Sequence, residues 1–276
     1  MANTENSREA RFRVIETLLL WEGEVDNGRL RTLLDIQNVQ ASRVLSEYAA
    51  RNPAQIRRPS PRSPCLAAPG IKPSYSAGTV EEYLELLRIA GELGGVIEDA
   101  RVDLTAPVAK IFSTVLQACR RNCGLNMEYR SMTTPGGSHR LIFPHTVVRA
   151  GRRWHVRAWC TERKEFRDFV IGRIVSAALD PGLSSRPKSE DAAWGKKLPL
   201  VLASHPALSH AQQQVIRDEF FAGAVSRRLL VRSCLLFYVV QDLRAAVNPA
   251  KEKPPEFQLV VSNVEDLRPY LLQQAS

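Results

Sequence analysis

The first fifty residues contain three short stretches in which apolar side chains recur every three or four positions, the spacing of one face of an α-helix. The first stretch covers 8–21, the second follows Asp26, a residue suited to capping a helix, and the third covers 39–51. Only a brief break separates the second helix from the third. Three helices with a tight second connection predict a helix-turn-helix. The apolar face of its third helix comprises Ala41, Val44, Leu45 and Tyr48.

The segment after the third helix is too rich in proline and serine to be helical. Two short extended pieces within it, 55–58 and 65–68, flank the basic turn 59–62. A β-wing has this arrangement, although an ordinary linker explains the prolines equally well. We predict a winged helix-turn-helix over 1–75.

Two further stripes of apolar residues at helical spacing follow the proline-rich segment. The first stripe comprises Val80, Tyr83, Leu84 and Leu87, and the second comprises Val108, Ile111, Phe112, Val115, Leu116 and Cys119. We predict that both helices belong to a bridge over 76–122, which packs the N-terminal domain against the next one.

From Leu125 onward the apolar period changes from that of helices to that of strands. The strand-like segments are 125–131, 139–143, 145–151, 153–160 and 166–174. The first two are separated by Thr-Thr-Pro-Gly-Gly, which is a hairpin signal. Four or five short strands after a helix predict a small Sm-like or SH3-like β-barrel over 123–180.

The remaining residues, 181–276, mix helical and strand patterns after a polar linker at 179–197. Ser-His-Ala-Gln at 209–212 fits a capping box that opens a helix ending near Phe221. We further predict a helix over 227–244, a strand over 257–261 and a final helix over 264–274. This is a C-terminal α/β domain, and its apolar stretch 229–240 supplies either dimer contacts or the domain's own core. The whole chain is thus predicted to be an α+β multidomain protein.

The charge of the chain changes this picture by suggesting a partner. Lysine and arginine outnumber aspartate and glutamate by 38 to 29 in 276 residues, which gives a formal charge of +9. The excess favours a polyanionic partner such as nucleic acid, although many basic proteins never bind one. The N-terminus lacks the apolar core of a signal peptide, and the longest apolar run contains Arg232 and is too short to cross a bilayer. We expect a cytoplasmic protein with no membrane partner.

The five cysteines are odd in number and scattered, so a disulfide scaffold is not expected. Cys119 and Cys123 have the spacing of one helical face and could form half of a metal site. No second pair of cysteines or histidines has a matching spacing. We therefore predict structural thiols and no bound metal.

The polar face of the third helix carries the strongest indication of DNA binding. Glutamine and arginine can each make bidentate contacts with a base edge, and serine can bind a base or a phosphate. Between 38 and 62, five arginines face the single acid Glu47, a local charge of +4. The alternative is a solvated helix followed by a charged loop. The predicted DNA-binding residues are Gln40, Ser42, Arg43, Ser46, Arg57, Arg58 and Arg62.

Several short motifs then occur in the order and spacing of a WYL domain, which the sequence resembles. They are Tyr129-Arg130-Ser131, Pro144 with Val147-Val148 and Gly151, Arg153-Trp154-His155-Val156, and the run from Arg167 to Ile174. The run RWHVRAWC is similar to the variant found in the BrxR/CapW group of phage-defence regulators, and SHPALSHAQQQVIRDEF resembles the start of their C-terminal domain. The resemblance covers essentially the whole chain. It implies an N-terminal winged helix, a central WYL barrel and a C-terminal dimerisation domain.

One position departs from the motif after which WYL domains are named. The chain has Trp154-His155-Val156 where the motif has Trp-Tyr-Leu. Tryptophan and valine keep the apolar face of the strand, but an imidazole replaces a phenol at the middle position. The role of His155 in a pocket is therefore open, because it can donate a hydrogen bond or carry a charge.

The same segment predicts a ligand site. Strand alternation places Arg153, His155, Arg157 and Trp159 on one face. Between 149 and 173, eight basic residues face three acidic ones, and guanidinium groups beside aromatic rings suit phosphates and stacked bases. The alternative is a basic strand exposed to solvent, with Arg173 fixing a turn. By resemblance the candidate ligand residues are Tyr129, Ser131, His145, Arg157, Arg167 and Arg173, to which we add His155.

Catalysis is not indicated by any motif in the chain. P-loop, GxGxxG, GxSxG and HExxH signatures are absent from the sequence. His139, His145 and His155 could meet in the barrel, but no acid or cysteine pair completes a metal or catalytic site. We expect a protein without enzymatic activity or cofactor.

Together these features predict a transcription regulator, most simply a repressor of a phage-defence operon. It would bind double-stranded DNA at an inverted repeat as a homodimer and respond to a nucleotide or oligonucleotide effector in the WYL domain. The sign of the response is left open. The rival hypothesis is an accessory protein of a defence effector, in which the basic barrel grips single-stranded nucleic acid.

Overall fold

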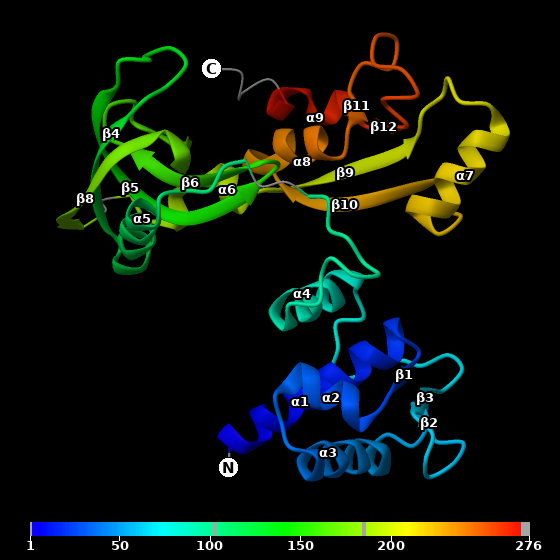
Figure 1. Ribbon diagram of the computed structural model, residues 1–276. Coiled ribbons are helices and arrows are strands. Elements are labelled where there is room, and N and C mark those ends of the chain that lie inside the picture. The colour runs from blue at the N-terminus through cyan, green and yellow to red at the C-terminus, as the bar shows by residue number, and fades with distance from the viewer. Residues whose placement is uncertain (1, 102–103, 184–185, 272–276) are drawn as a thin grey trace. The chain divides into compact units, whose positions relative to one another are not determined.

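The first three amphipathic segments form helices α1 (Ala2–Trp21), α2 (Asn27–Leu34) and α3 (Asn38–Arg51) in the computed structural model, which describes residues 2–101, 104–183 and 186–271 (Figure 1). Asp26 caps α2, because its carboxylate accepts a hydrogen bond from the Arg29 backbone N–H at 2.7 Å. The apolar faces of the three helices meet in one core, and the predicted face of α3 is buried in it. The helix-turn-helix prediction is confirmed.

A small antiparallel sheet completes this domain. Its strands are β1 (Glu24–Val25), β2 (Ile56–Arg57) and β3 (Cys65–Ala67), and β3 lies between the other two. Strands β2 and β3 are the two extended pieces that flank the basic turn, so this segment is a β-wing and not a plain linker. Strand β1 was not anticipated, because two residues are too few to show a period.

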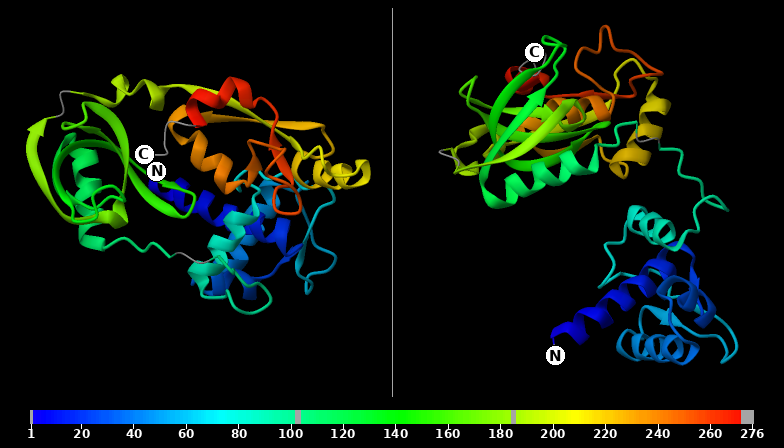
Figure 2. Two further views of the ribbon diagram at one scale, coloured as in Figure 1. Left: turned by 90° about the horizontal axis from the view of Figure 1, so that it is seen from above. Right: turned by 60° about the vertical axis from the view of Figure 1, so that its left-hand side comes forward.

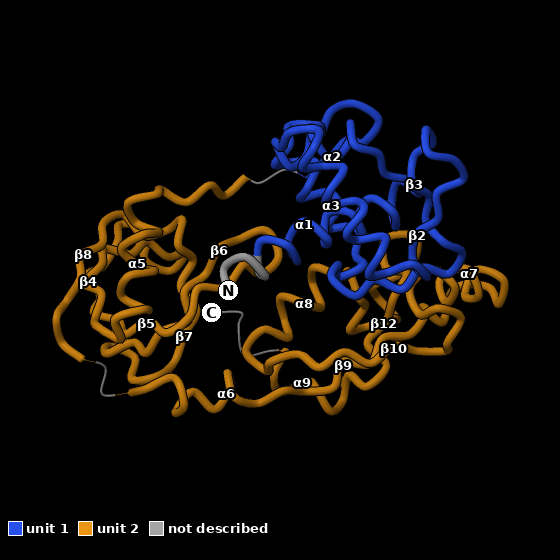
Figure 3. The backbone as a smooth tube through the Cα atoms, turned by 90° about the horizontal axis from the view of Figure 1, so that it is seen from below, with its two compact units in different colours: residues 1–101 blue, residues 102–276 orange. Residues whose placement is uncertain are grey.

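The two helices of the predicted bridge pack into different cores. Helix α4 (Val80–Ala90) contributes Tyr83 and Leu87 to the core of the helix-turn-helix, whereas α5 (Ala109–Arg121) packs into the core of the β-domain. The chain accordingly forms two units, 1–101 and 102–276 (Figure 3). Val80 and Val108 lie at the N-terminal ends of these helices and are 49% and 64% exposed, so their assignment to the apolar stripes was wrong.

A buried carboxylate ties the helices of the first unit together. Glu16 on α1 is fully buried, and its Oε1 accepts a hydrogen bond from the Tyr48 hydroxyl of α3 at 3.1 Å. Its Oε2 accepts from the successive backbone N–H groups of Ser74, Tyr75 and Ser76 at 2.9, 2.6 and 2.9 Å. Burial and the adjacent Glu16 both raise the pKa of Tyr48. Helix α1 thereby fixes both α3 and the segment that leads to α4.

Replacing this carboxylate by an amide is expected to weaken the first unit. Glu16→Gln keeps the size of the side chain but turns one acceptor oxygen into a donor that faces donors. Loss of charged hydrogen bonds of this kind costs about 1.5–3 kcal/mol. Hydrogen exchange of the full-length chain should show a matching loss of amide protection confined to 2–101. The control is Glu9→Gln, at an exposed position of the same helix. Equal amide protection in the two variants would contradict the stabilising role of the Glu16 carboxylate.

In the second unit the predicted strands form one antiparallel sheet. They are β4 (Cys123–Tyr129), β5 (Ser138–Ala150), β6 (Arg153–Cys160), β7 (Glu165–Val170) and β8 (Ile174–Leu183), ordered β7-β6-β5-β4-β8. The sheet, called the β-barrel below, curls beside α5, which packs against β4, β5 and β8 (Figure 2). The turn between β4 and β5 confirms the predicted hairpin. The segments 139–143 and 145–151 are one strand, β5, with a register shift between Pro144 and Thr146.

The polar segment 179–197 is only partly a linker. Strand β8 runs through it to Leu183, and a short helix, α6 (Ala192–Gly195), closes it. Residues 184–185 lie outside the described part of the chain. The alternation of β8 is hidden by the Asp-Pro-Gly sequence at 180–182, which is typical of turns.

The C-terminal domain is a second mixed sheet with helices. Its elements are β9 (Lys197–Ser204), α7 (His210–Phe221), β10 (Ser226–Arg232), α8 (Leu236–Asp242), β11 (Ala245–Ala246), β12 (Leu259–Val261) and α9 (Val264–Leu271). The sheet order is β10-β9-β12-β11, with β11 and β12 parallel. The capping box at the start of α7, the strand β12 and the helix α9 are confirmed. Residues 272–274 of the predicted last helix lie outside the described residues.

The helix predicted over 227–244 was wrong in its first half. Residues 226–232 are strand β10, paired along its whole length with β9, and a 3-10 turn at Ser233–Leu235 precedes α8. A short continuous apolar run has no period that separates a helix from a buried strand, and the partner strand β9 was not foreseen. Leu236 and Val240 of α8 are buried in the domain's own core, which supports that alternative for the stretch 229–240.

Candidate nucleic-acid interface and ligand cleft

The polar face of α3 projects away from the core of the first unit. Gln40, Arg43 and Ser46 are exposed, as predicted from the position of the apolar face. Ser42 is half-buried, and its hydroxyl accepts a hydrogen bond from Asn27 Nδ2 at 2.6 Å. Gln40 Oε1 accepts from the Gln37 backbone N–H at 3.2 Å at the start of the helix. Arg43 and Ser46 are therefore the most available of the four predicted DNA-contacting side chains on this helix.

The wing adds three exposed arginines beside α3. Arg57 ends β2, and Arg58 and Arg62 lie in the turn between β2 and β3. Arg58 Nε donates to the Ser63 backbone carbonyl at 3.2 Å, which helps to order the turn. Among the described residues, no carboxylate lies within 4.0 Å of the side-chain nitrogens of Arg43, Arg57, Arg58 or Arg62. Glu47, the only acid of this stretch, pairs with Arg8 and Arg51 instead.

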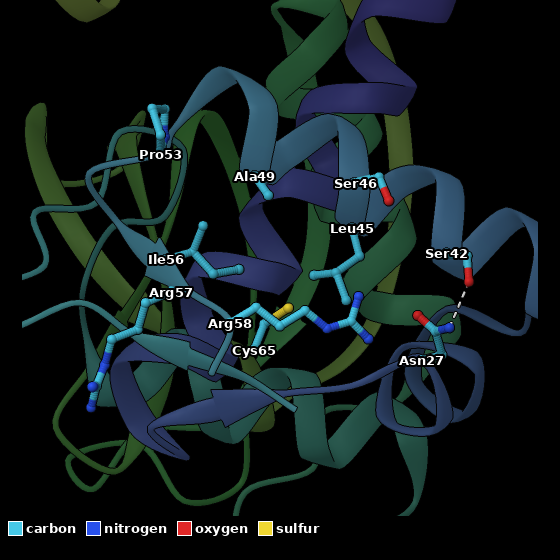
Figure 4. A pocket seen from close by; sticks show the side chains of 10 residues that line it. All are labelled: Asn27, Ser42, Leu45, Ser46, Ala49, Pro53, Ile56, Arg57, Arg58 and Cys65. Atoms are coloured by element: carbon cyan, nitrogen blue, oxygen red, sulfur yellow. Dashed lines mark hydrogen bonds between the residues drawn. The ribbon is translucent and has the colours of Figure 1, made fainter. Parts of the chain in front are cut away.

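A pocket of about 230 Å³ separates the helix from the wing. Figure 4 shows Arg58 reaching across it toward Leu45, whereas Arg57 points away from it. Cys65 lies at its base, and burial raises the pKa of this thiol, so it is a neutral wall and not a reactive group. The hydroxyls of Ser42 and Ser46 and the Arg58 guanidinium make the rim a surface of donors. Such a surface can receive the sugar-phosphate backbone of a duplex whose base edges face α3.

The second unit contains a much larger cleft, of about 1400 Å³, between the β-barrel and the C-terminal domain. Six of the seven predicted ligand residues line it: Tyr129, Ser131, His155, Arg157, Arg167 and Arg173. Further cations, Arg152, Arg153 and Lys196, and the aromatic side chains Phe166, Tyr238 and Tyr270 share the lining. Within the described residues, no carboxylate lies within 4.0 Å of the guanidinium of Arg152, Arg153 or Arg173. The cleft can therefore hold an anion with aromatic parts.

The individual side chains differ in how free they are. The Tyr129 hydroxyl accepts a hydrogen bond from the Val170 backbone N–H at 3.1 Å, and Arg167 pairs with Glu165 at 3.3 Å. Ser131 is bonded within its own turn. These three shape the cleft, and their contact with a ligand stays a prediction.

His155 occupies the position at which the chain departs from the WYL motif. It is 4% exposed, and its ring lies 4.7 Å from the ring of Tyr238. Burial lowers the pKa of His155, so the imidazole is neutral at physiological pH. Its Nδ1 has no hydrogen-bond partner among the described residues. Of the two roles left open by the sequence, the structure favours a neutral hydrogen-bonding group over a charge.

Arg157 lies at the base of the cleft between two carboxylates. Its Nε and Nη2 donate to the two oxygens of Asp191 at 2.7 and 2.9 Å, and its Nη1 donates to Asp168 at 3.3 Å. Burial alone would lower the pKa of Arg157, but Asp191 and Asp168 outweigh it and raise the pKa. The guanidinium is thus permanently charged and largely neutralised within the protein.

His145 does not line the cleft but belongs to the same network. Its Nε2 lies 3.1 Å from Asp191 Oδ2, and its ring packs edge-on against Phe166 and Trp194. Asp191 is 2% exposed and also caps α6 by accepting a hydrogen bond from the Trp194 backbone N–H at 3.1 Å. Burial alone would raise the pKa of Asp191, but His145 and Arg157 hold it well below its ordinary value. His145 thus stabilises the Asp191 carboxylate that binds Arg157.

Sequence reasoning missed the acidic partners of this site. Asp191 was taken as part of a linker, and Asp168 was read only as one charge in a strand. Tyr238 was assigned to an apolar helix. A buried arginine needs a carboxylate, so the inward-facing Arg157 was a signal that an acid had to lie nearby. Which acid it was could not be read from spacing along the chain.

The cysteines and histidines give no second site. All five cysteines are free, as expected, and burial raises the pKa of Cys119 to about 12 and that of Cys234 to about 11. Thiols of this kind stay protonated and are poor metal ligands. Among the described residues, no three side chains of histidine, cysteine, aspartate or glutamate are placed to hold a metal ion. No helix of the described part is long and apolar enough to cross a membrane.

Comparison with known proteins gives three family matches in the order that the motifs predicted. The BrxR transcriptional regulator winged helix-turn-helix domain matches 7–89, the WYL domain matches 110–179, and the BrxR C-terminal dimerization domain matches 197–267. The DNA-binding transcriptional repressor CapW of Escherichia coli strain KTE188 is 30% identical, over 96% of this chain and 92% of that protein. The CapW repressors of Pseudomonas aeruginosa and Stenotrophomonas maltophilia are 29% and 28% identical, each over 95% of this chain and 91% of theirs.

Proposed function

Because this chain belongs to the family of BrxR and CapW transcription regulators, we propose that it is a DNA-binding repressor that acts as a homodimer on an inverted repeat and is controlled by a nucleotide or nucleic-acid ligand. Its relatives are named DNA-binding transcriptional repressors. The proposal assigns DNA binding to the first unit, dimerisation to the C-terminal domain and ligand binding to the cleft.

The observation that carries the DNA-binding role is the cluster of uncompensated cations on one side of the winged helix. Arg43 lies on the exposed face of α3, and Arg57, Arg58 and Arg62 lie on the adjacent wing, without a carboxylate in reach among the described residues. An arginine that has no acidic partner is available to a phosphate or a guanine edge. In the proposed complex α3 lies in a major groove, and the wing follows the flanking backbone.

Dimerisation is what makes the operator an inverted repeat. Two copies related by a two-fold axis present their recognition helices about 34 Å apart, or a multiple of that distance, to successive major grooves. The match of 197–267 to a dimerization domain supports this arrangement.

Ligand control is proposed from the chemistry of the cleft. Arg152, Arg153 and Arg173 are cations without an acidic partner in the described structure, and Tyr238 and Phe166 add aromatic surface. Phosphates and bases are the groups that such a lining recognises. We propose that the ligand releases the DNA, which requires it to bind the released state more tightly than the DNA-bound state.

The decisive test is a titration of full-length protein against duplex DNA from its own upstream region. Fluorescence anisotropy should give tight binding that a scrambled duplex does not displace, and footprinting should cover an inverted repeat. Weak binding that any duplex removes would contradict the repressor. It would favour the rival, an accessory protein whose barrel grips single-stranded nucleic acid.

Removing the base-reading side chains is expected to abolish sequence preference. In the double variant Gln40→Ala with Arg43→Ala, each lost bidentate contact costs about 1–3 kcal/mol of discrimination. The affinity for the operator should therefore fall at least to that for scrambled duplex, whereas the matched Arg121→Ala on α5 should leave it unchanged. A double variant that still prefers the operator would show that α3 does not read it.

A test of the rival hypothesis, the single-strand-binding accessory protein, requires a variant other than Arg157→Ala. Removing Arg157 leaves Asp191 buried without its main partner, so loss of binding would report misfolding instead of a lost contact. Arg153→Ala with Arg173→Ala removes cations from the cleft and no described ion pair. If the rival hypothesis is right, this double variant should no longer bind single-stranded nucleic acid. If the protein is a repressor, the double variant should bind the operator as well as wild type does in the absence of ligand.

A further inference from the structure

The network at the base of the cleft is attached to two helices, α6, which is bonded to the C-terminal domain through Ser233, and α8 of that domain. One attachment is Asp191, which caps α6 and holds Arg157. The other is Asp168 on β7, whose Oδ2 accepts a hydrogen bond from the hydroxyl of Tyr238 on α8 at 3.3 Å. Residues Leu236 and Val240 of α8 are buried in the core of the C-terminal domain. Arg157 therefore lies between two carboxylates, of which Asp191 is tied to α6 and Asp168 to α8.

The two attachments differ in strength. Arg157 grips Asp191 with two short hydrogen bonds, 2.7 and 2.9 Å long, and His145 lies 3.1 Å from the same carboxylate. The Arg157–Asp168 and Tyr238–Asp168 distances are both 3.3 Å, near the upper limit for hydrogen bonds. Competition for Arg157 will therefore act first on the Asp168 side.

The cleft gives an anion access to Arg157. A guanidinium carries five N–H groups, and the three bonds to Asp191 and Asp168 leave two of them without an acceptor among the described residues. Arg153 and Arg173 line the same cleft and add positive charge. A phosphate that binds there shares the guanidinium with Asp168 and weakens its hold on that carboxylate.

Tyr238 is the side chain that would sense this change. Its hydroxyl contacts Asp168, its ring lies against His155, and both neighbours line the cleft. Burial and the charge of Asp168 raise the pKa of Tyr238, so the phenol stays a donor across the physiological range. A displaced Asp168 loosens the only described hydrogen bond between β7 and α8.

We propose that Asp168 and Tyr238 are positioning residues of the ligand response, in which a phosphate-bearing anion competes with Asp168 for Arg157 and so releases α8 from the barrel. This inference rests on the ligand control proposed above and specifies how ligand binding is transmitted. The effect passes from the cleft to the C-terminal domain, whose family match is a dimerization domain. A shift of α8 relative to the barrel is a route by which ligand changes the arrangement of the two DNA-binding units.

The test compares Tyr238→Phe with wild type in the full-length protein. The substitution removes one hydroxyl and keeps the ring against His155. The probes are a short oligothymidylate and thymidine 5′-monophosphate, which share phosphate chemistry and distinguish a chain from a single nucleotide. Two quantities are measured by anisotropy: the affinity for each probe, and the ratio of operator affinities without and with saturating probe.

Wild type should show a ratio of roughly 5–150, the usual range for coupled sites. In Tyr238→Phe the ratio should fall toward one, with weaker operator binding in the absence of probe and tighter probe binding, because the contact that the anion must loosen is already gone. If Tyr238 had only a structural role, the substitution would not raise the affinity for the probe. The control is Ser262→Ala, which removes a hydroxyl that donates to the Val201 carbonyl in the C-terminal domain outside the cleft lining, and which should behave as wild type.

The outcomes separate the two proposals. A wild-type ratio of one with both probes would overturn ligand control and this inference together. A normal wild-type ratio that Tyr238→Phe retains, or weaker probe binding by that variant, would overturn the switch and leave ligand control standing.

Discussion

Raising the salt concentration from about 50 to 200 mM is expected to lower the affinity of the protein for its operator roughly 10³-fold. The reason is the three wing arginines, Arg57, Arg58 and Arg62, which are exposed and lack carboxylate partners among the described residues. Each arginine that neutralises a phosphate releases condensed counterions from the duplex, and salt opposes that release.

The magnitude follows from the number of contacts. Three arginines on each of two protomers make six phosphate contacts, so the slope of log K against log salt is about −0.9 × 6, or roughly −5.4. A fourfold rise in salt then costs a factor of about 4 to the power 5.4, which is on the order of 10³. Arg43 is not counted among the phosphate contacts, because it faces base edges in the proposed complex.

Removing the wing arginines provides the comparison. The triple variant Arg57→Ala, Arg58→Ala, Arg62→Ala should bind much more weakly at low salt and have a nearly flat salt dependence. The control, Arg120→Ala, Arg121→Ala, Arg163→Ala, lowers the net charge equally at exposed positions of the second unit. If both triple variants lose the same slope, the wing has no special contact with DNA and the field of the whole protein accounts for binding.

The winged helix was readable from the sequence because its parts are local. The caps, the helical period and the basic turn each lie within a few residues, and the core positions of α3 follow from spacing alone. Glu16 was not readable in the same way, because the backbone N–H groups that donate to it come from 58 to 60 residues further along the chain. Only the fold brings the segment 74–76 to α1.

The cleft was half predictable for a related reason. Alternation along β6 placed Arg157 and His155 on the face opposite to Val156, and both do line the cleft. The other wall, with Tyr238 and Tyr270, belongs to a domain whose strand β10 was predicted as a helix. Sequence periodicity describes one strand at a time, whereas a cleft is formed by two surfaces.

Replacing Asp191 by alanine is expected to destabilise the second unit by about 3–5 kcal/mol, the usual cost of breaking a buried ion pair by removing one partner. The substitution leaves Arg157 buried with only Asp168 opposite it, frees the His145 ring nitrogen and removes the cap of α6. Urea unfolding followed by tryptophan fluorescence reports mainly on this unit, because three of the four tryptophans, Trp154, Trp159 and Trp194, lie within it. The control is the neighbouring Glu190→Ala, an exposed carboxylate whose loss should change stability by less than about 0.5 kcal/mol.

The pH dependence separates the charge of Asp191 from its capping role. Asp191→Asn keeps a side-chain oxygen that can cap α6 but has no charge for Arg157. Since the folded-state pKa of Asp191 is depressed below its unfolded value near 4, the carboxylate stabilises the folded state fully above that value. This contribution is lost as the pH falls through the folded-state pKa. The stability difference between wild type and Asp191→Asn should therefore be constant from pH 6 to pH 8, on the order of the ion-pair cost, and should narrow below about pH 4. A difference that is the same at pH 3 and pH 7 would show that shape or capping, and not the charge gripped by Arg157, holds α6 to the barrel.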